Sequence, residues 1–234
     1  MNRLIARALV LASVASAGLG SVSAHADTLS IQITEYMYNG LGTSSIGEFV
    51  EFTNLSGSAI DMTGWSFDDN TRTAGSQSLS AFGVVAAGES VILTDDTATS
   101  FRTRWSLAGT VKVIGGNTNN LGRADEVNLY NASNVLVDRM TYDDQLLGGT
   151  RTSGVSATVL FANLGLNLTA STIAAAVSDS YGSIKNTTGV GEIANPGFYY
   201  SANGTSPVPV PAAAWLMVSG LGALGAMARR RRQA

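Results

Sequence analysis

Short segments of alternating apolar and polar residues, separated by turn-forming residues, recur throughout the first two thirds of the chain. Ile31 and Ile33 alternate with polar neighbours, and Gly47–Trp65 predicts a strand, a turn at Asn54–Ser58 and a second apolar segment that ends on a tryptophan. A period of two places successive side chains on opposite faces of a strand. Many short strands with turn signals between them predict an all-β fold, a sandwich or barrel without βαβ units.

The strand predicted after Gly47 has an acidic residue on each of its two faces. Because Glu48 and Glu51 fall on opposite faces, they do not make the facing carboxyl pair that glycosidase-type catalysis needs. One face carries Glu48, Val50 and Phe52, and the other carries Phe49, Glu51 and Thr53.

Further strands are expected along the chain up to Asp144, and the following fifty residues are less periodic. Ile173–Val177 is consistent with a short helix or a buried strand, and periodicity does not decide between them. The expected strands lie at Val84–Leu93 with a turn at Ala86–Glu89, around Val111 and Val113, around Val127 and Leu129, and around Val135 and Val137 after a turn at Asn131–Asn134.

The chain resembles the lamin-tail domain, a small immunoglobulin-like β-sandwich. Its first strand carries Ile33–Glu35, its second carries Glu48–Glu51, and Ile60, Asp61, Gly64 and Trp65 follow them. The resemblance implies one sandwich domain over residues 27–200. It extends to a turn at Gly88, a closing hairpin with Leu121, Gly122, Asp125, Val127, Leu129, Val137 and Asp138, and trailing elements at Gly154–Ser156 and Asn195–Gly197.

The N-terminus has the three parts of a secretory signal peptide over residues 1–26. Arg3 and Arg7 precede the apolar run Ala8–Gly20, and Ala24 and Ala26 form a small-x-small cleavage site. We therefore expect the mature chain to begin at Asp27. A retained membrane helix is the alternative, although the run is short for a span.

The C-terminus resembles a PEP-CTERM sorting signal, which implies an exosortase-type processing enzyme as a partner. Residues 201–211 predict a linker with a proline motif, and 212–228 predict a single transmembrane helix without charge. Residues 229–234 are then a basic cytoplasmic tail. A plain membrane anchor is the alternative. The sorting motif comprises Val208, Pro209, Val210, Pro211, Trp215, Arg229, Arg230, Arg231 and Arg232.

Charge is unevenly distributed along the chain. The net charge is −3, but six of the 14 basic residues lie in the two terminal segments, whereas all 17 acidic residues lie between them. The acidic middle disfavours nucleic acid as a partner. The only histidine, His25, falls in the signal peptide and the chain has no cysteine, so the usual general base and thiolate nucleophile are missing from the mature chain.

Two groups of side chains are candidates for binding. Acidic pairs at predicted strand ends are either solvated turn residues or oxygen ligands for weak Ca²⁺ binding. Five aromatic residues are either core or a stacking surface for a glycan or peptide. The acidic pairs are Asp68–Asp69, Asp95–Asp96, Asp125–Glu126 and Asp143–Asp144, and the aromatic residues are Trp65, Phe67, Trp105, Tyr130 and Tyr142.

The leading interpretation is an exported, non-enzymatic module for adhesion or scaffolding, with no cofactor, no catalytic residue and no metal site. It would be anchored in the inner membrane during sorting and then placed at the cell surface or in the extracellular matrix. Its partner there would be a polysaccharide or a surface protein. The alternative is a secreted hydrolase associated with nuclease or phosphatase activity, or the accessory binding domain of one.

Overall fold

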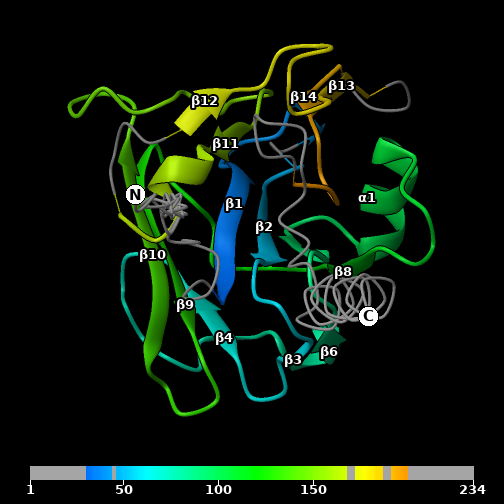
Figure 1. Ribbon diagram of the computed structural model, residues 1–234. Helices are drawn as coiled ribbons and strands as arrows, with labels where there is room; N and C mark the ends of the chain where they lie inside the picture. The colour runs from blue at the N-terminus through cyan, green and yellow to red at the C-terminus, as the bar shows by residue number, and fades with distance from the viewer. Residues whose placement is uncertain (1–29, 44–45, 168–171, 187–190, 200–234) are drawn as a thin grey trace, which may run out of the picture.

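The computed structural model describes residues 30–43, 46–167, 172–186 and 191–199, and these form an almost entirely β structure with one α-helix (Figure 1). The strands are β1 Ile31–Met37, β2 Phe49–Asn54, β3 Ile60–Asp61, β4 Ser66–Asp68, β5 Gln77–Ser78, β6 Val84–Val85, β7 Ser90–Thr94, β8 Lys112–Ile114, β9 Ala124–Tyr130, β10 Leu136–Asp143, β11 Ala157–Val159, β12 Thr172–Ala174, β13 Ile184–Lys185 and β14 Ile193–Ala194. The helix α1 spans Ala98–Trp105, and two 3-10 turns lie at Ser80–Phe82 and Phe161–Asn163.

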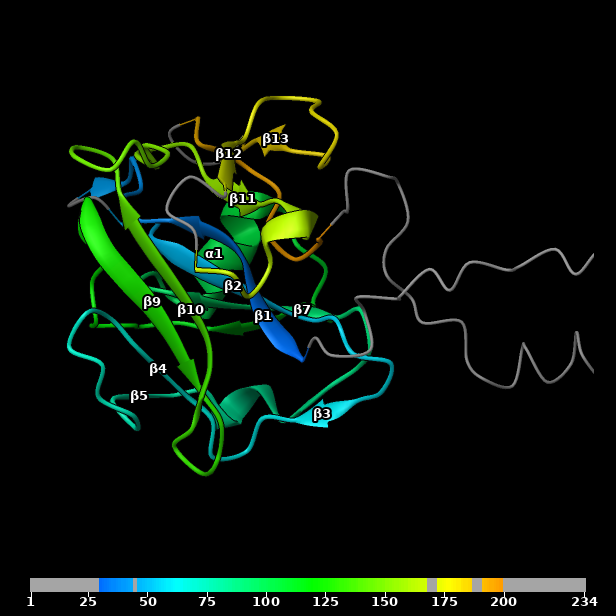
Figure 2. The same cartoon turned by 60° about the vertical axis from the view of Figure 1, so that its left-hand side comes forward.

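Two sheets make the sandwich. The larger has six strands in the order β12-β11-β1-β2-β7-β8, and the smaller has four in the order β10-β9-β4-β5. The remaining strands form two short pairs, β13 with β14 and β3 with β6. Figure 2 shows the long β9–β10 hairpin crossing in front of the larger sheet. Because β11 and β12 join the larger sheet beside β1, chain beyond residue 144 completes the same sandwich.

The main core lies between the two sheets. Val50 and Phe52 of β2 meet Phe67, Val127 and Leu129 from the smaller sheet, and all five side chains are buried. The prediction that Val50 and Phe52 share one face of their strand is confirmed, and that face is buried. Burying large side chains at native packing density supplies the main driving force for this arrangement.

A second core covers the other face of the larger sheet. Met37, Phe49 and Ile92 pack against Phe101 and Trp105 of α1. This explains why β1, β2 and β7 are buried at every residue, which alternation alone does not predict. In Figure 1, α1 and the β9–β10 hairpin lie on opposite sides of β1 and β2.

The helix α1 was not predicted from the sequence. It begins where Thr97 Oγ1 accepts the Ser100 N–H at 3.1 Å, and it ends at Ser106, which is left-handed at φ 53°. It connects β7 to β8, and these two strands run parallel. The expectation that the fold would lack βαβ units is wrong for this connection, because tertiary packing of Phe101 and Trp105 stabilises a helix whose sequence is mostly polar.

A bulge in β1 changes which residues face the second core. The pairing with β2 shifts between Ile33 and Glu35, so that Thr34 is the extra residue. Before the bulge, Ile31 and Ile33 face the main core, and after it Tyr36 does. The bulge therefore brings Glu35 to the face that carries Thr34 and Glu51.

Three predicted segments differ from the structure. The apolar segment before Trp65 is a strand only at β3, which pairs with β6, because a turn at Met62–Trp65 follows. At the start of β10 a bulge between Leu136 and Asp138 interrupts the alternation, and Val135 is 57% exposed. Ile173–Val177 is neither a helix nor a buried strand: β12 is an edge strand with Ile173 46% exposed.

The predicted signal peptide, linker, transmembrane helix and basic tail lie outside the described residues. Within the described ranges, no helix has the length and apolar character that crossing a membrane requires.

Candidate functional site

Two buried glutamates hold the last described segment of the chain against the larger sheet. Glu35 and Glu51 are directly opposite on β1 and β2, and neither is exposed. Glu35 accepts the Asn195 N–H at 3.0 Å, and Glu51 accepts the Gly197 N–H at 2.7 Å. The segment Asn195–Gly197 is thus fixed by two backbone donors that point at two carboxyl groups.

Hydroxyl groups complete the surroundings of this carboxyl pair. Ser156 donates to Oε1 of Glu35, and Thr34 donates to Oε1 of Glu51 at 2.7 Å. Burial, followed by the nearby charge of Glu51, raises the pKa of Glu35 to about 8. Burial also raises the pKa of Glu51. At neutral pH the pair therefore retains a proton, since two ionised carboxylates without a counter-charge would be costly here.

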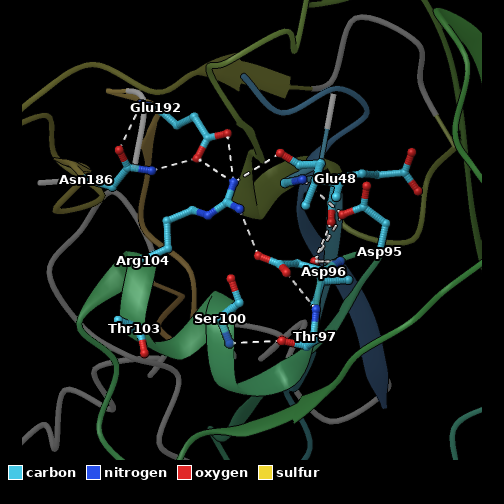
Figure 3. Close-up of polar contacts among 12 residues, drawn as sticks. Glu48, Asp95, Asp96, Thr97, Ser100, Thr103, Arg104, Asn186 and Glu192 are labelled. Carbon is cyan, nitrogen blue, oxygen red and sulfur yellow. Dashed lines mark hydrogen bonds and ion pairs between the residues drawn. The ribbon is translucent and has the colours of Figure 1, made fainter. Parts of the chain in front are cut away.

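A buried ion cluster centres on Arg104 of α1 (Figure 3). Its guanidinium lies 2.8 Å from Asp96 Oδ2 and 3.3 Å from Glu192 Oε1, and it donates to the carbonyl oxygen of Ile46 at 3.0 Å. The Arg104 side chain is 12% exposed and that of Glu192 is fully buried. Gly47 is required beside this cluster, because a Cβ there would lie 2.6 Å from Glu192 Oε1 at a φ of 128°.

Glu192 also receives donors from two loops. The N–H of Leu41 donates to Oε1 at 2.7 Å, and the Asn186 amide donates to Oε2 at 2.6 Å. One arginine and one glutamate therefore join α1, the loop after β1 and the loop between β13 and β14. The cluster fixes the end of α1 at which the aromatic residue Trp105 lies.

A hollow of about 180 Å³ opens beside Trp105 at this end of α1. Its floor contains Trp105, Tyr181 and Asn195, which are buried, whereas Ile184 and Phe198 on its walls are 47% and 46% exposed. Leu107, Gly182 and Pro196 complete the lining. Two exposed apolar side chains over a largely aromatic floor offer a site for an apolar group.

The polar groups of the lining are mostly engaged inside the protein. The amide of Asn195 donates to the Phe198 carbonyl at 2.8 Å, and its oxygen lies 3.4 Å from the hydroxyls of Thr158 and Ser183. The indole N–H of Trp105 is different, because it is buried without a hydrogen-bond partner among the described residues. The accessible surface of the hollow is therefore mainly apolar.

A third carboxylate bridges the two sheets. Asp138 of β10 accepts the Ile33 N–H of β1 at 2.8 Å through one oxygen, and the Arg139 N–H at 2.8 Å through the other. Burial raises the pKa of Asp138 to about 6. The bulges in β1 and β10 lie at this contact, so the carboxylate satisfies an amide near the point where the ladder is interrupted.

The prediction that the acidic pairs are solvated turn residues is wrong for most of them, because Asp68, Asp125–Glu126 and Asp143 lie in β4, β9 and β10, and five of the eight residues are buried. Asp68 accepts the Thr73 N–H at 2.6 Å, and Asp143 accepts the N–H groups of Gln145 and Leu146. Buried turns need such internal acceptors, because water cannot supply them. The buried members are Asp68, Asp96, Asp125, Glu126 and Asp143.

No metal-binding group emerges from these carboxylates. Among the residues that the structure describes, no three histidine, cysteine, aspartate or glutamate side chains gather to hold a metal ion. Weak Ca²⁺ binding stays a prediction.

Four of the five aromatic candidates belong to the two cores, and Tyr130 is buried as well. Trp65, Phe67, Trp105, Tyr130 and Tyr142 are all buried, and Trp65 is the most exposed of them at 9%. Their predicted core role is confirmed. The cleavage-site residues Ala24 and Ala26 and the sorting-motif residues from Val208 to Arg232 lie outside the described residues.

Sequence reasoning missed the carboxyl pair and the hollow. It compared Glu48 with Glu51, whereas the partner of Glu51 is Glu35 on the neighbouring strand. The resemblance had already singled out both residues, but strict alternation places Glu35 on the face of Ile31 and Ile33, so the sequence pattern does not pair it with Glu51. The exposed Phe198 that borders the hollow lies directly after Asn195–Gly197, a motif that sequence reasoning assigned only to a trailing element.

Comparison with known proteins identifies the domain. A family model described as Lamin Tail Domain matches residues 24–144, just over half of the chain. No curated protein matches, and no solved structure matches. The matched residues include β1, β2 and the β9–β10 hairpin, the elements that build the main core. The chain therefore belongs to the lamin tail domain family.

Proposed function

We propose that the protein is an exported, non-enzymatic binding or scaffolding module of the cell surface or extracellular matrix. The domain is a β-sandwich of a family compatible with such a role. The observation that carries the binding role is the hollow between Trp105, Ile184 and Phe198. Its lining holds no carboxylate, imidazole, thiol or amine, which suits recognition of an apolar group better than acid–base chemistry.

The buried carboxyl pair gives no support to a hydrolase. Glu35 and Glu51 are both 0% exposed, and the groups that surround them are donors from the protein itself. A general acid or base must reach the proton that it transfers. These two carboxyls serve the fold by holding Asn195–Gly197.

Delivery to the surface forms the second part of the proposal. A signal peptide over residues 1–26 would export the chain, and the tail from Val208 to Arg232 would be recognised by an exosortase-type enzyme while 212–228 is held in the inner membrane. Support comes from the order of proline motif, apolar run and four arginines in the sequence. The partner at the surface would be a polysaccharide or a surface protein, with no role for nucleic acid.

Surface retention tests the binding role. Purified exported protein is added to cells of the producing species that lack their own copy, and the bound fraction is measured. Phe198→Ser and Ile184→Ser should each release most of the protein, since they remove the exposed walls of the hollow. Val84→Ser is the matched control, because Val84 is 58% exposed on β6 and does not line the hollow. Equal retention of all three variants would contradict the binding role.

A further inference from the structure

We propose that the hollow beside Trp105 binds the Val208–Pro211 segment of this same chain before the tail is processed. The inference rests on the hollow being the binding site of the proposed function, and it names an occupant for that site. Three features of the chain support it.

The first feature is the character of the lining. Phe198 supplies exposed aromatic surface and Ile184 an exposed aliphatic wall, and both lie over the buried rings of Trp105 and Tyr181. Aromatic-lined grooves are the surfaces on which extended, proline-rich peptides dock. Val208–Pro211 alternates valine with proline, so it favours the extended polyproline conformation.

Charge is the second feature. The eight lining residues of the hollow carry no charged side chain, and the segment from Ser201 to Ala228 is also uncharged. A charged peptide would lose hydration here without gaining a counter-charge. An uncharged proline–valine segment loses little on entering the hollow.

Chain length is the third feature. Phe198 borders the hollow, and the described chain ends one residue later at Tyr199. Nine peptide units separate Tyr199 from Val208, and at about 3.3–3.6 Å each they span up to about 30 Å. The connection is therefore long enough for the segment to return to the hollow without moving the domain.

A docked segment would also be withheld from the processing enzyme. A protease that receives an extended strand competes for the same backbone that the hollow binds. The segment would then have to leave the hollow before it is cleaved. Cleavage would leave the hollow free for a partner at the surface.

Photo-crosslinking in the full chain tests this occupant. Position 184 is replaced by p-benzoylphenylalanine, and the same replacement at Val84 serves as the control. The protein is irradiated in membranes of a host without exosortase, so that the result depends on neither sorting nor a surface partner. Mass spectrometry should locate an adduct between position 184 and residues 207–211 of the same chain, and none from position 84.

Two further arms make the result decisive. Replacing Pro209 and Pro211 together by glycine should lower the adduct yield by about tenfold, because the preformed extended conformation is lost. An excess of the synthetic peptide covering Ser206–Ala212 should suppress the adduct. Absence of an adduct within 207–211, in protein with the near-ultraviolet circular dichroism of the unmodified chain, would overturn the proposal. An adduct found only between two chains would overturn it as well, since the occupant would be a second copy.

Discussion

Glu35 and Glu51 face each other across the first two strands, and each accepts a backbone N–H from the segment Asn195–Gly197, about 150 residues further along the chain. The two carboxyls therefore join the start of the domain to its end. They also hold one side of the hollow, because Asn195 and Pro196 belong to its lining.

Removing one of these acceptors should destabilise the domain. Glu51→Ala leaves the Gly197 N–H without its acceptor, at roughly 1–3 kcal/mol of unfolding free energy, whereas the Thr34 hydroxyl keeps its contact with Thr53 Oγ1 at 2.8 Å. Glu51→Gln keeps an oxygen in place and should lose less. Urea unfolding of the 27–206 fragment measures both. Wild-type midpoints for the alanine variant would show that the contact contributes nothing.

Stability should fall as the pH rises through the neutral range. Burial raises the pKa of Asp138 from 3.8 to about 6, of Glu35 from 4.5 to about 8 and of Glu48 from 4.5 to about 9. The folded state therefore binds these protons more tightly than the unfolded chain does. The contribution of these three protonated carboxyl groups to the free energy of unfolding is fully present below about pH 4. It is lost progressively as the pH rises to about 9.

Glu126 has the opposite effect on the pH dependence of stability. Its hydrogen bonds with Arg72 lower its pKa from 4.5 to about 2, so its contribution to stability is present above pH 4.5 and is lost as the pH falls towards 2.

Urea midpoints at pH 5, 7 and 9 should decline in that order, and Glu48→Gln should flatten the decline between pH 7 and 9. A midpoint that rises from pH 5 to pH 9 would refute the assignment.

The Arg104 cluster should contribute far more than an exposed ion pair. Arg104→Met leaves the fully buried Glu192 without its counter-charge, which typically costs about 3–5 kcal/mol. Arg72→Met is the matched control: Arg72 pairs with Glu126 but its side chain is 55% exposed, so solvent screens the pair and its loss should cost much less. Chemical denaturation of both variants compares them. Equal losses would mean that burial of the cluster has no energetic consequence.

Trp65 should be among the most sensitive positions of the main core. It is 9% exposed and packs between the sheets, so Trp65→Ala should lower the free energy of unfolding by roughly 3–5 kcal/mol. The urea midpoint of the 27–206 fragment reports this loss. A loss below about 1 kcal/mol would place the ring in a solvent-exposed role instead.

The sandwich could be predicted from the sequence because its strands keep a period of two. The faces of Val50 and Phe52, the turn after Val85 and the β9–β10 hairpin all follow from local pattern. The carboxyl pair could not be predicted in the same way. Strict alternation puts Glu35 beside Ile31 and Ile33, and only the bulge at Thr34 brings it beside Glu51.

The helix and the hollow depend on contacts between distant segments. Most side chains of α1 are polar, and its position is set by Phe101, Trp105 and the ion cluster at Arg104. The hollow needs residues from α1 and from the last twenty described residues to meet, with Asn195–Gly197 held by glutamates of β1 and β2. A local sequence pattern does not predict contacts between segments so far apart in the chain.

The mass of the product tests the proposed delivery most directly. The protein is expressed in an exosortase-positive host, and intact mass is measured for the membrane fraction and for the released fraction. We predict a released product that begins at Asp27 and lacks the segment 212–234, and we predict that deleting Arg229–Arg232 reduces its amount. Persistence of the full Asp27–Ala234 chain in the membrane of that host would contradict sorting and leave the tail as a plain anchor.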